Sequence, residues 1–166
     1  MHPHPLLPPV MLLVVTLASA GCSPSPPPQA PPPPSASRAL LDVQARHSED
    51  AELGGLAGLL VAVENRSTQP VRGIRITISA SYFSGLELRR FDPPPLRTEL
   101  GPAAYTFEFT GPRPGVRFGY LIVLTPRQEG EYPAEVTVLM VGPDEREELL
   151  AIYDITTRVR PPQVAH

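Results

Sequence analysis

The sequence predicts an all-β fold, a single antiparallel β-sandwich of seven or eight strands. Three observations lead to this prediction. Apolar residues alternate with polar ones over several short segments. Gly, Pro and Asn separate these segments at intervals of about 8–12 residues, which is the spacing typical of sandwich strands. Helix signals are poor, because only residues 145–152 combine good helix formers and β-branched residues flank them.

The first half of the predicted domain contains three strands in chain order. Leu40–Ala45 is a weak candidate with a short β pattern. Leu59–Val63 is apolar on both faces, which suits a central strand. Val71–Ala80 is the clearest strand of all, because its isoleucines alternate with polar residues. This period of two predicts one face against the core and one face in solvent.

The second half contributes five further candidates. Leu86–Phe91 is weak, whereas residues 105–110 alternate aromatic side chains with Thr and Glu. Phe118–Leu124 is apolar on both faces and again suits a central strand. Tyr132–Val141 and Leu149–Val159 are two β-rich runs. The Gly-Pro-rich, charged segment 142–147 that separates them is typical of a polar hairpin loop.

Composition divides the chain into four parts. Residues 1–21 contain an apolar stretch with the length of a secretory signal peptide. The stretch is too short to span a bilayer, which needs about 20 apolar residues. Residues 22–38 form a Pro/Ser-rich segment with almost nothing to bury, so we expect a disordered, stiff tether. The sandwich is expected at 39–160, followed by a disordered tail at 161–166.

Cys22 is the single cysteine of the chain, and it directly follows the apolar stretch and four small residues, Ala18, Ser19, Ala20 and Gly21. This ending resembles the lipobox of bacterial lipoproteins, where small residues precede a lipidated cysteine. The resemblance implies cleavage before Cys22 and acylation there with palmitate-type chains. Because two or more acyl chains anchor a protein stably, it also implies lasting membrane attachment.

The same resemblance implies a location in the cell envelope. Ser23 slightly favours the outer membrane, on the enterobacterial rule that Asp at this position favours inner-membrane retention. Two alternatives stay open. Ala18-Ser19-Ala20 also fits the A-x-A pattern of the general signal peptidase, which would give a secreted protein. The chain would otherwise be a cytosolic protein with an apolar start.

Two segments resemble immunoglobulin-like sandwiches. Residues 61–74, VAVENRSTQPVRGI, resemble bacterial extracellular domains of the CARDB type, in which one strand ends in Asn and a short polar turn precedes the next. Glu129–Tyr132 resembles the tyrosine corner, whose hydroxyl bonds back to the upstream backbone. Ala134 stands where antibody domains have their second cysteine. The resemblance implies an immunoglobulin-like sandwich without an internal disulfide.

Composition argues against nucleic-acid and metal chemistry. The chain has 14 basic and 17 acidic residues, whereas nucleic-acid binding needs a concentrated basic face. Zinc sites draw three or four ligands mainly from Cys and His. Outside the first 21 residues the chain offers Cys22, His47 and His166, with His47 in an apparent polar loop. We therefore expect no nucleic-acid partner, no metal and no cofactor.

Carboxylates crowd two predicted turns, Glu129 with Glu131 and the segment Asp144–Glu148. A glycosidase needs two carboxylates about 5–9.5 Å apart in a cleft. Turn residues are exposed by default, so we interpret both groups as solvated charge. His47 lacks a G-x-S-x-G nucleophile motif as a companion. These patterns predict that the protein is not an enzyme.

Two local motifs have a functional and a structural interpretation. Arg89, Arg90 and Phe91 precede a rigid Pro-rich stretch and would contact a partner, because Arg and aromatic residues are enriched in interfaces. The interpretation that we favour is an edge strand protected from aggregation by the prolines. Asn65-Arg66-Ser67 matches an N-glycosylation acceptor, which we interpret as coincidence.

The sequence thus predicts a non-enzymatic interaction or structural module, anchored to a membrane through Cys22, with an unidentified envelope protein as its partner. The alternative is a carbohydrate- or peptidoglycan-binding module. Sugar-binding platforms favour Trp, which this chain lacks, so Tyr82, Tyr105 and Tyr120 would have to serve instead. A sandwich fold by itself does not decide between these functions.

Overall fold

The computed structural model describes residues 40–142 and 144–163. The predicted signal peptide, the tether with Cys22 and the last three residues of the predicted tail lie outside this range. The described residues form ten strands and one short 3-10 helix, η1 (Ala80–Ser84). No helix in this part of the chain is long and apolar enough to cross a membrane.

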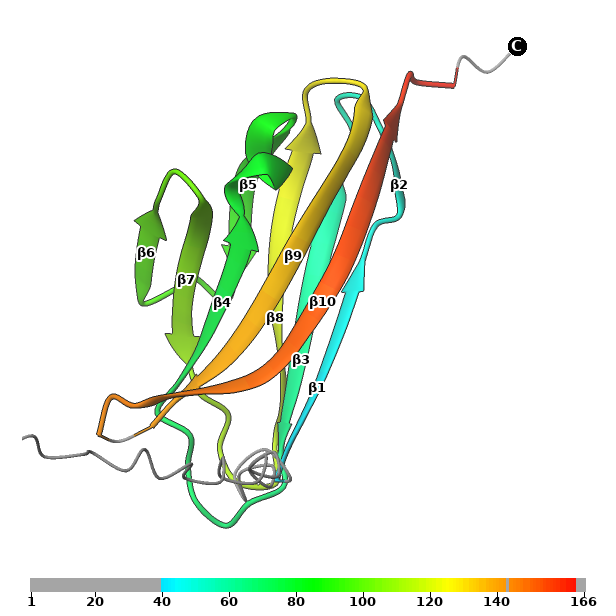
Figure 1. Ribbon diagram of the computed structural model, residues 1–166. Helices are drawn as coiled ribbons and strands as arrows, with labels where there is room; N and C mark the ends of the chain where they lie inside the picture. The colour runs from blue at the N-terminus through cyan, green and yellow to red at the C-terminus, as the bar shows by residue number, and fades with distance from the viewer. Residues whose placement is uncertain (1–39, 143, 164–166) are drawn as a thin grey trace, which may run out of the picture. The chain divides into compact units, whose positions relative to one another are not determined.

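The strands build two sheets that pack face to face as a sandwich (Figure 1). The four-stranded sheet has the order β1 (Leu41–His47), β3 (Ala57–Asn65), β8 (Arg117–Pro126) and β5 (Leu86–Asp92). The six-stranded sheet has the order β2 (Asp50–Glu52), β10 (Glu147–Arg160), β9 (Gly130–Val141), β4 (Gly73–Ser79), β7 (Ala104–Thr110) and β6 (Arg97–Leu100). All described pairings are antiparallel except β2 with β10.

The all-β sandwich predicted from the sequence is confirmed, and each of the eight expected strands is present. The additional strands, β2 and β6, are short edge strands of three and four residues. Every residue of β6 is exposed, so no alternating pattern marks it in the sequence. The expected hairpin loop is also confirmed: β9 ends at Val141, and β10 begins at Glu147.

The core lies between the sheets and is built from the alternating residues that the sequence shows. Ile74, Ile76 and Ile78 of β4 are at most 1% exposed. Each buried aliphatic or aromatic side chain stabilises the fold by about 1.5–3 kcal/mol. Aromatic rings also join the two sheets: Phe109 of β7 packs on Tyr120 of β8 with ring centroids 4.9 Å apart. The Tyr120 hydroxyl donates to the Thr110 carbonyl oxygen, which satisfies its polar group.

The predicted tyrosine corner is confirmed. The hydroxyl of Tyr132 lies 3.0 Å from the carbonyl oxygen of Gln128, to which it donates, and 3.3 Å from that of Glu129. Gly85 is required beside it, because a Cβ at that position would lie 2.0 Å from the Tyr132 hydroxyl oxygen. The backbone N–H of Arg127 donates to the Gly85 carbonyl oxygen. The corner therefore attaches the β8–β9 loop to the start of β5.

We expect Tyr132→Phe to lower the free energy of unfolding by about 1 kcal/mol, because the substitution removes the corner hydroxyl and leaves the ring in place. Urea denaturation checks this value. Tyr105→Phe is the matched control, since the Tyr105 hydroxyl has no hydrogen bond within the described residues. Equal stability losses in the two variants would show that the corner hydrogen bonds contribute nothing.

Candidate functional site

The outer face of the four-stranded sheet carries apolar residues along its centre. Core-facing residues of β3 and β8 alternate with residues that point outward. We define the apolar strip as the outward residues that pair in register across these strands: Gly58 with Val123, Leu60 with Leu121, and Ala62 with Gly119. Leu60 is 36% exposed. The solvent-facing side of an antiparallel sheet is usually polar, so this face departs from the common pattern.

A hollow of about 280 Å³ opens beside the strip. Ala62 and Gly119 lie opposite each other in the sheet and have the smallest side chains of its lining. A Cβ on Gly119 would come within 3.2 Å of the Leu60 side chain. Gln44 and Arg117 form part of the rim, where the Arg117 guanidinium donates to the Gln44 side-chain oxygen at 2.7 Å. Because Ala62 has a small side chain and Gly119 has none, the surface of the sheet forms a depression with an apolar floor at this point.

Three arginines surround the apolar strip. Arg46 on β1 pairs in register with Leu60, and Arg90 on β5 pairs with Val123. Arg117 begins β8 at the end of the strip. None of the three forms an ion pair within the described part of the chain, in contrast to the arginines that do: Arg66, Arg72, Arg75, Arg97, Arg127, Arg146, Arg158 and Arg160. The strip therefore has unneutralised positive charge around it.

Most carboxylates of this face already have cationic partners. Arg66 lies 3.0 Å from the Asp42 carboxylate and 3.1 Å from that of Glu64. The hydrogen bond from Arg66 holds the pKa of Glu64 below its usual value. Asp92 at the end of β5 is a carboxylate of this face with no ion pair among the described residues. The face thus combines apolar area with an excess of unpaired arginines, both of which are frequent in protein interfaces.

The outer face of the six-stranded sheet is largely polar and internally paired. The hydroxyl groups of Thr77 and Thr106 lie 3.1 Å apart across β4 and β7. Arg75 of β4 bridges two carboxylates, Glu108 at 2.9 Å and Glu147. Because these groups satisfy one another, this part of the face resembles an ordinary solvated surface.

One corner of that face differs. Leu139 and Leu149 are register partners on β9 and β10, and Glu135 and Asp154 are partners farther along the same strands. Ile152 lies between these pairs and is 52% exposed. Neither Glu135 nor Asp154 forms an ion pair within residues 40–142 and 144–163. We call these five residues the acidic corner.

The structure places the predicted partner-contact residues on an edge strand. β5 pairs with β8 alone and has a bulge between Leu88 and Arg90. Arg89 and Arg90 are exposed, whereas the Phe91 ring lies 4.7 Å from that of Phe107 and packs against the core. The edge position is confirmed. Partner contact through the two arginines stays a prediction, and Phe91 points inward because the bulge reverses the alternation of the strand.

The interpretation of His47 as a loop residue is wrong. His47 ends β1, because the pairing of β1 with β3 continues to the register pair His47 and Leu59. The side chain is half-buried, and its Nε2 atom lies 3.1 Å from the Thr156 carbonyl oxygen. Among the residues that the structure describes, no three His, Cys, Asp or Glu side chains gather in a way that would hold a metal ion.

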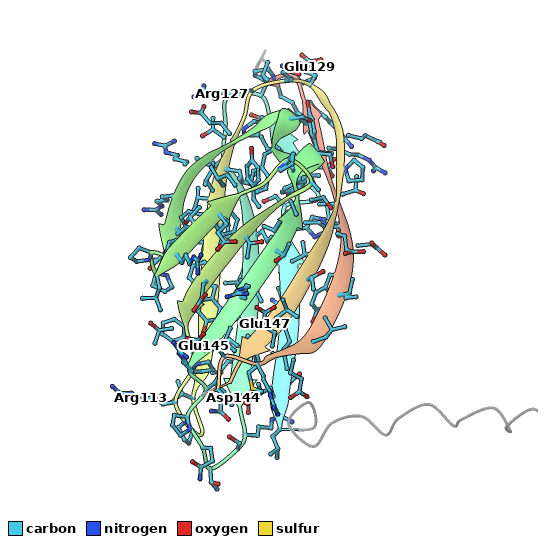
Figure 2. The ribbon with its side chains drawn as sticks, turned by 60° about the vertical axis from the view of Figure 1, so that its left-hand side comes forward. Arg113, Arg127, Glu129, Asp144, Glu145 and Glu147 are labelled. Atoms are coloured by element: carbon cyan, nitrogen blue, oxygen red, sulfur yellow. The ribbon has the colours of Figure 1, made fainter. Side chains whose placement is uncertain are left out.

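The carboxylate groups singled out from the sequence lie far apart. Figure 2 shows Glu129 at one end of the domain and Asp144, Glu145 and Glu147 at the opposite end. Glu145 forms an ion pair with Arg72 at 3.1 Å. These carboxylates therefore do not form one acid–base pair, and their exposure agrees with their interpretation as solvated charge.

The tyrosines proposed as a sugar-binding platform do not form one. Tyr82 and Tyr120 are at most 1% exposed, and burial raises the pKa of both phenols. Tyr105 stacks on Phe83 with ring centroids 4.5 Å apart. The sequence shows aromatic residues in strands but not which face they occupy, so this expectation was wrong for Tyr82 and Tyr120.

Asn65 organises the end of the domain where the described chain begins. Its side chain is completely buried. The amide nitrogen donates to the carbonyl oxygens of Gln69 at 2.9 Å and Pro112 at 3.1 Å. The amide oxygen accepts from the Ser67 backbone N–H and hydroxyl. One side chain thus connects the β3–β4 loop to the β7–β8 loop.

The β3–β4 loop borders a second hollow. A groove of about 580 Å³ lies between Leu40, residues 66–72 and the end of β9 at Met140–Gly142. Burial and four hydrogen bonds leave the Asn65 amide unavailable for glycosylation in the folded protein. This supports the interpretation of the acceptor motif as coincidence.

The apolar strip was missed in the sequence, although its signal was present. Leu59–Val63 and Phe118–Leu124 were recognised as apolar on both faces and predicted as central strands, which the structure confirms. In soluble proteins this pattern usually means that both faces are covered. Within the described residues, however, no element packs on the outer face of β3 and β8.

No protein-family model and no curated protein matches this chain. A cohesin module from a family 33 glycoside hydrolase of Clostridium perfringens superimposes with a TM-score of 0.57 at 9% identity, over 74% of this chain and 98% of the module. A CARDB domain from Pyrococcus furiosus gives a TM-score of 0.42 at 17% identity, over 72% and 87%. The cohesin module thus has a fold similar to that of this chain, a β-sandwich, and the likeness extends no further.

We expect Asn65→Ala to lower the free energy of unfolding by about 2–3 kcal/mol, because it leaves buried carbonyl oxygens without donors. Urea denaturation measures the effect. Arg66→Ala is the control, since its exposed ion pairs contribute about 0–1 kcal/mol. If both variants lose the same small amount, the Asn65 network is not what holds the two loops together.

Proposed function

We propose that this protein is a non-enzymatic binding module, anchored in the cell envelope by lipid on Cys22, whose four-stranded sheet binds a protein partner. The apolar strip is the observation on which this proposal rests. Its two central strands are apolar on both faces, yet one face packs on the core and the other is partly open to solvent, with Leu60 36% exposed and Val123 7% exposed. Exposed contiguous apolar surface rimmed by polar groups is typical of interaction sites.

The arginines add to this argument. Arg46 and Arg90 form no ion pair within the described domain, although most of its other arginines do, whereas Arg117 lies opposite Glu64 and interacts with its charge. Arg is enriched in protein interfaces because its planar guanidinium stacks and forms paired hydrogen bonds. A partner that supplies carboxylates around an apolar centre would satisfy both features of the face.

A non-enzymatic role is supported by the placement of the titratable groups. The crowded carboxylates lie at opposite ends of the domain (Figure 2). His47 is engaged with a backbone carbonyl oxygen. The hollows beside Ala62 and Gly119 and at the loop end near Leu40 have no carboxylate in their linings. A third hollow, of about 450 Å³ beside β2, is lined by Asp50 and Glu52, and its Asp50 carboxylate is held by Arg160 at 2.8 Å.

The tether completes the proposal. Residues 23–37 contain only Ser, Pro, Ala and Gln. In a polyproline II conformation they would extend to roughly 45 Å, at about 3.1 Å per residue. Such a spacer between Cys22 and the domain would hold the sandwich away from the membrane surface, where its lateral faces are accessible to a partner.

A photo-crosslinking residue at Leu60 is expected to capture an envelope protein reproducibly in living cells, because this position lies at the centre of the apolar strip. Glu99, exposed on β6 at the far edge of the six-stranded sheet, is the matched control position. Mass spectrometry identifies the captured protein and the crosslinked peptide. Equal, unspecific capture from the two positions would remove the proposed binding face.

Cells that carry Cys22→Ala are expected to lose both the label from a clickable palmitate analogue and the recovery of the protein with membranes. Cys22 is the sole cysteine, so no second thiol of this chain replaces it. Ser23→Ala serves as the control and should keep the label. Label that survives in Cys22→Ala would disprove lipid anchoring at this residue, without bearing on the binding face.

A further inference from the structure

We propose that the partner of the apolar strip is a second copy of this protein, which places its acidic corner on the strip. The inference rests on the proposed function of the four-stranded sheet and adds the identity of the partner. The domain thereby carries two complementary surfaces, one on the outer face of each sheet.

Charge is the first argument. Arg46 and Arg90 flank the strip without an ion pair in the described chain, and Arg117, which lies opposite Glu64, adds a third cation at the end of the strip. Glu135 and Asp154 face each other across β9 and β10 without an arginine partner there. Elsewhere on the two faces, charges are mostly neutralised in pairs such as Arg75 with Glu108. The outer face of the four-stranded sheet thus has an excess of unpaired arginines over its one unpaired carboxylate named above, Asp92, whereas the acidic corner has two unpaired carboxylates. Such complementarity directs association.

Apolar surface is the second argument. Ile152 is 52% exposed and Leu149 39% exposed, which makes the acidic corner one of the places where large apolar side chains meet solvent. On the other face, the Ala62–Gly119 pair leaves a hollow of about 280 Å³ next to Leu60. A protruding aliphatic side chain on one copy therefore has a depression to fill on the next, with arginines at the rim of that depression to meet its neighbouring carboxylates.

The location of the surfaces determines the kind of assembly. The strip and the acidic corner lie on the outer faces of different sheets, so one copy engages two neighbours through different surfaces. Such a heterologous contact does not close into a two-fold dimer and extends as a row unless rotation closes a ring. Anchoring of copies on one membrane raises their effective concentration, which favours a contact of modest affinity.

Sedimentation velocity of the unlipidated chain Ser23–His166, which contains the whole described domain, tests the inference. We expect concentration-dependent species larger than a dimer at low salt, and weaker association at high salt because exposed charges are screened. Arg46→Glu with Arg90→Glu should weaken association about tenfold or more, and so should Glu135→Arg with Asp154→Arg. These residues have no ion pairs to lose, and circular dichroism verifies that each variant is folded.

Combining both pairs of reversals in one chain provides the decisive test. Each variant alone has like charges on both surfaces, whereas a chain that carries all four reversals restores complementarity and should associate again. Glu129→Arg is the matched control, because Glu129 is an exposed carboxylate outside the acidic corner that forms no ion pair among the described residues. It should leave association unchanged. Rescue by the four-fold reversal supports direct pairing of the two surfaces.

Three results would overturn the inference: a monomer at every concentration, association that neither double variant alters, or a closed dimer that depends on the strip alone. These failures are separable from failure of the proposed function. Capture of a different protein from Leu60, together with a monomer in solution, would retain the binding face and reject the second copy as its occupant. Crosslinks from Leu60 to β10 of another copy would support both.

Discussion

The pairing of β3 with β8 is the interaction on which the other features depend. These strands run antiparallel in continuous register from Ala57 opposite Leu124 to Glu64 opposite Arg117. Their inward residues supply much of one wall of the core, and their outward residues form the apolar strip. Because side chains alternate along a strand, the register that turns Leu59 and Ile122 into the core also turns Leu60 and Leu121 to the outer face. The core and the apolar strip are therefore consequences of one alignment.

Polar groups in the interior make that alignment specific. Asn65 ends β3, and the hydrogen bonds of its side-chain amide join the loops that follow β3 and β7. At the opposite end of the domain, the Tyr132 hydroxyl donates to the Gln128 carbonyl oxygen and thereby holds the β8–β9 loop. Buried polar groups tolerate few alternative arrangements, because any shift leaves a donor or acceptor without a partner. The two networks therefore hold both ends of the sandwich in place around its apolar centre.

The fold was predictable to the extent that its signals are local. Alternation along β4 and β7 and the two-sided apolarity of β3 and β8 are visible in short windows, so eight strands were identified. β2 and β6 were not, because three or four exposed residues contain no periodic signal. The orientation of Phe91 depends on a bulge at the edge of the sheet, and the burial of Asn65 depends on Pro112, 47 residues away. Such features follow from tertiary packing and leave no trace in sequence spacing.

The first strands have a mechanical consequence. β1 pairs antiparallel with β3 in one sheet, and the chain then crosses to β2, which pairs parallel with β10 in the other. A pull on the segment before Leu40, directed along β1, loads the hydrogen bonds of this strand together in shear. They would not break one after another, as they do when a strand is peeled from a sheet. Tension that enters before Leu40 therefore acts first on the pairing of β1 with β3 in the four-stranded sheet, and β2 in the other sheet follows it along the chain.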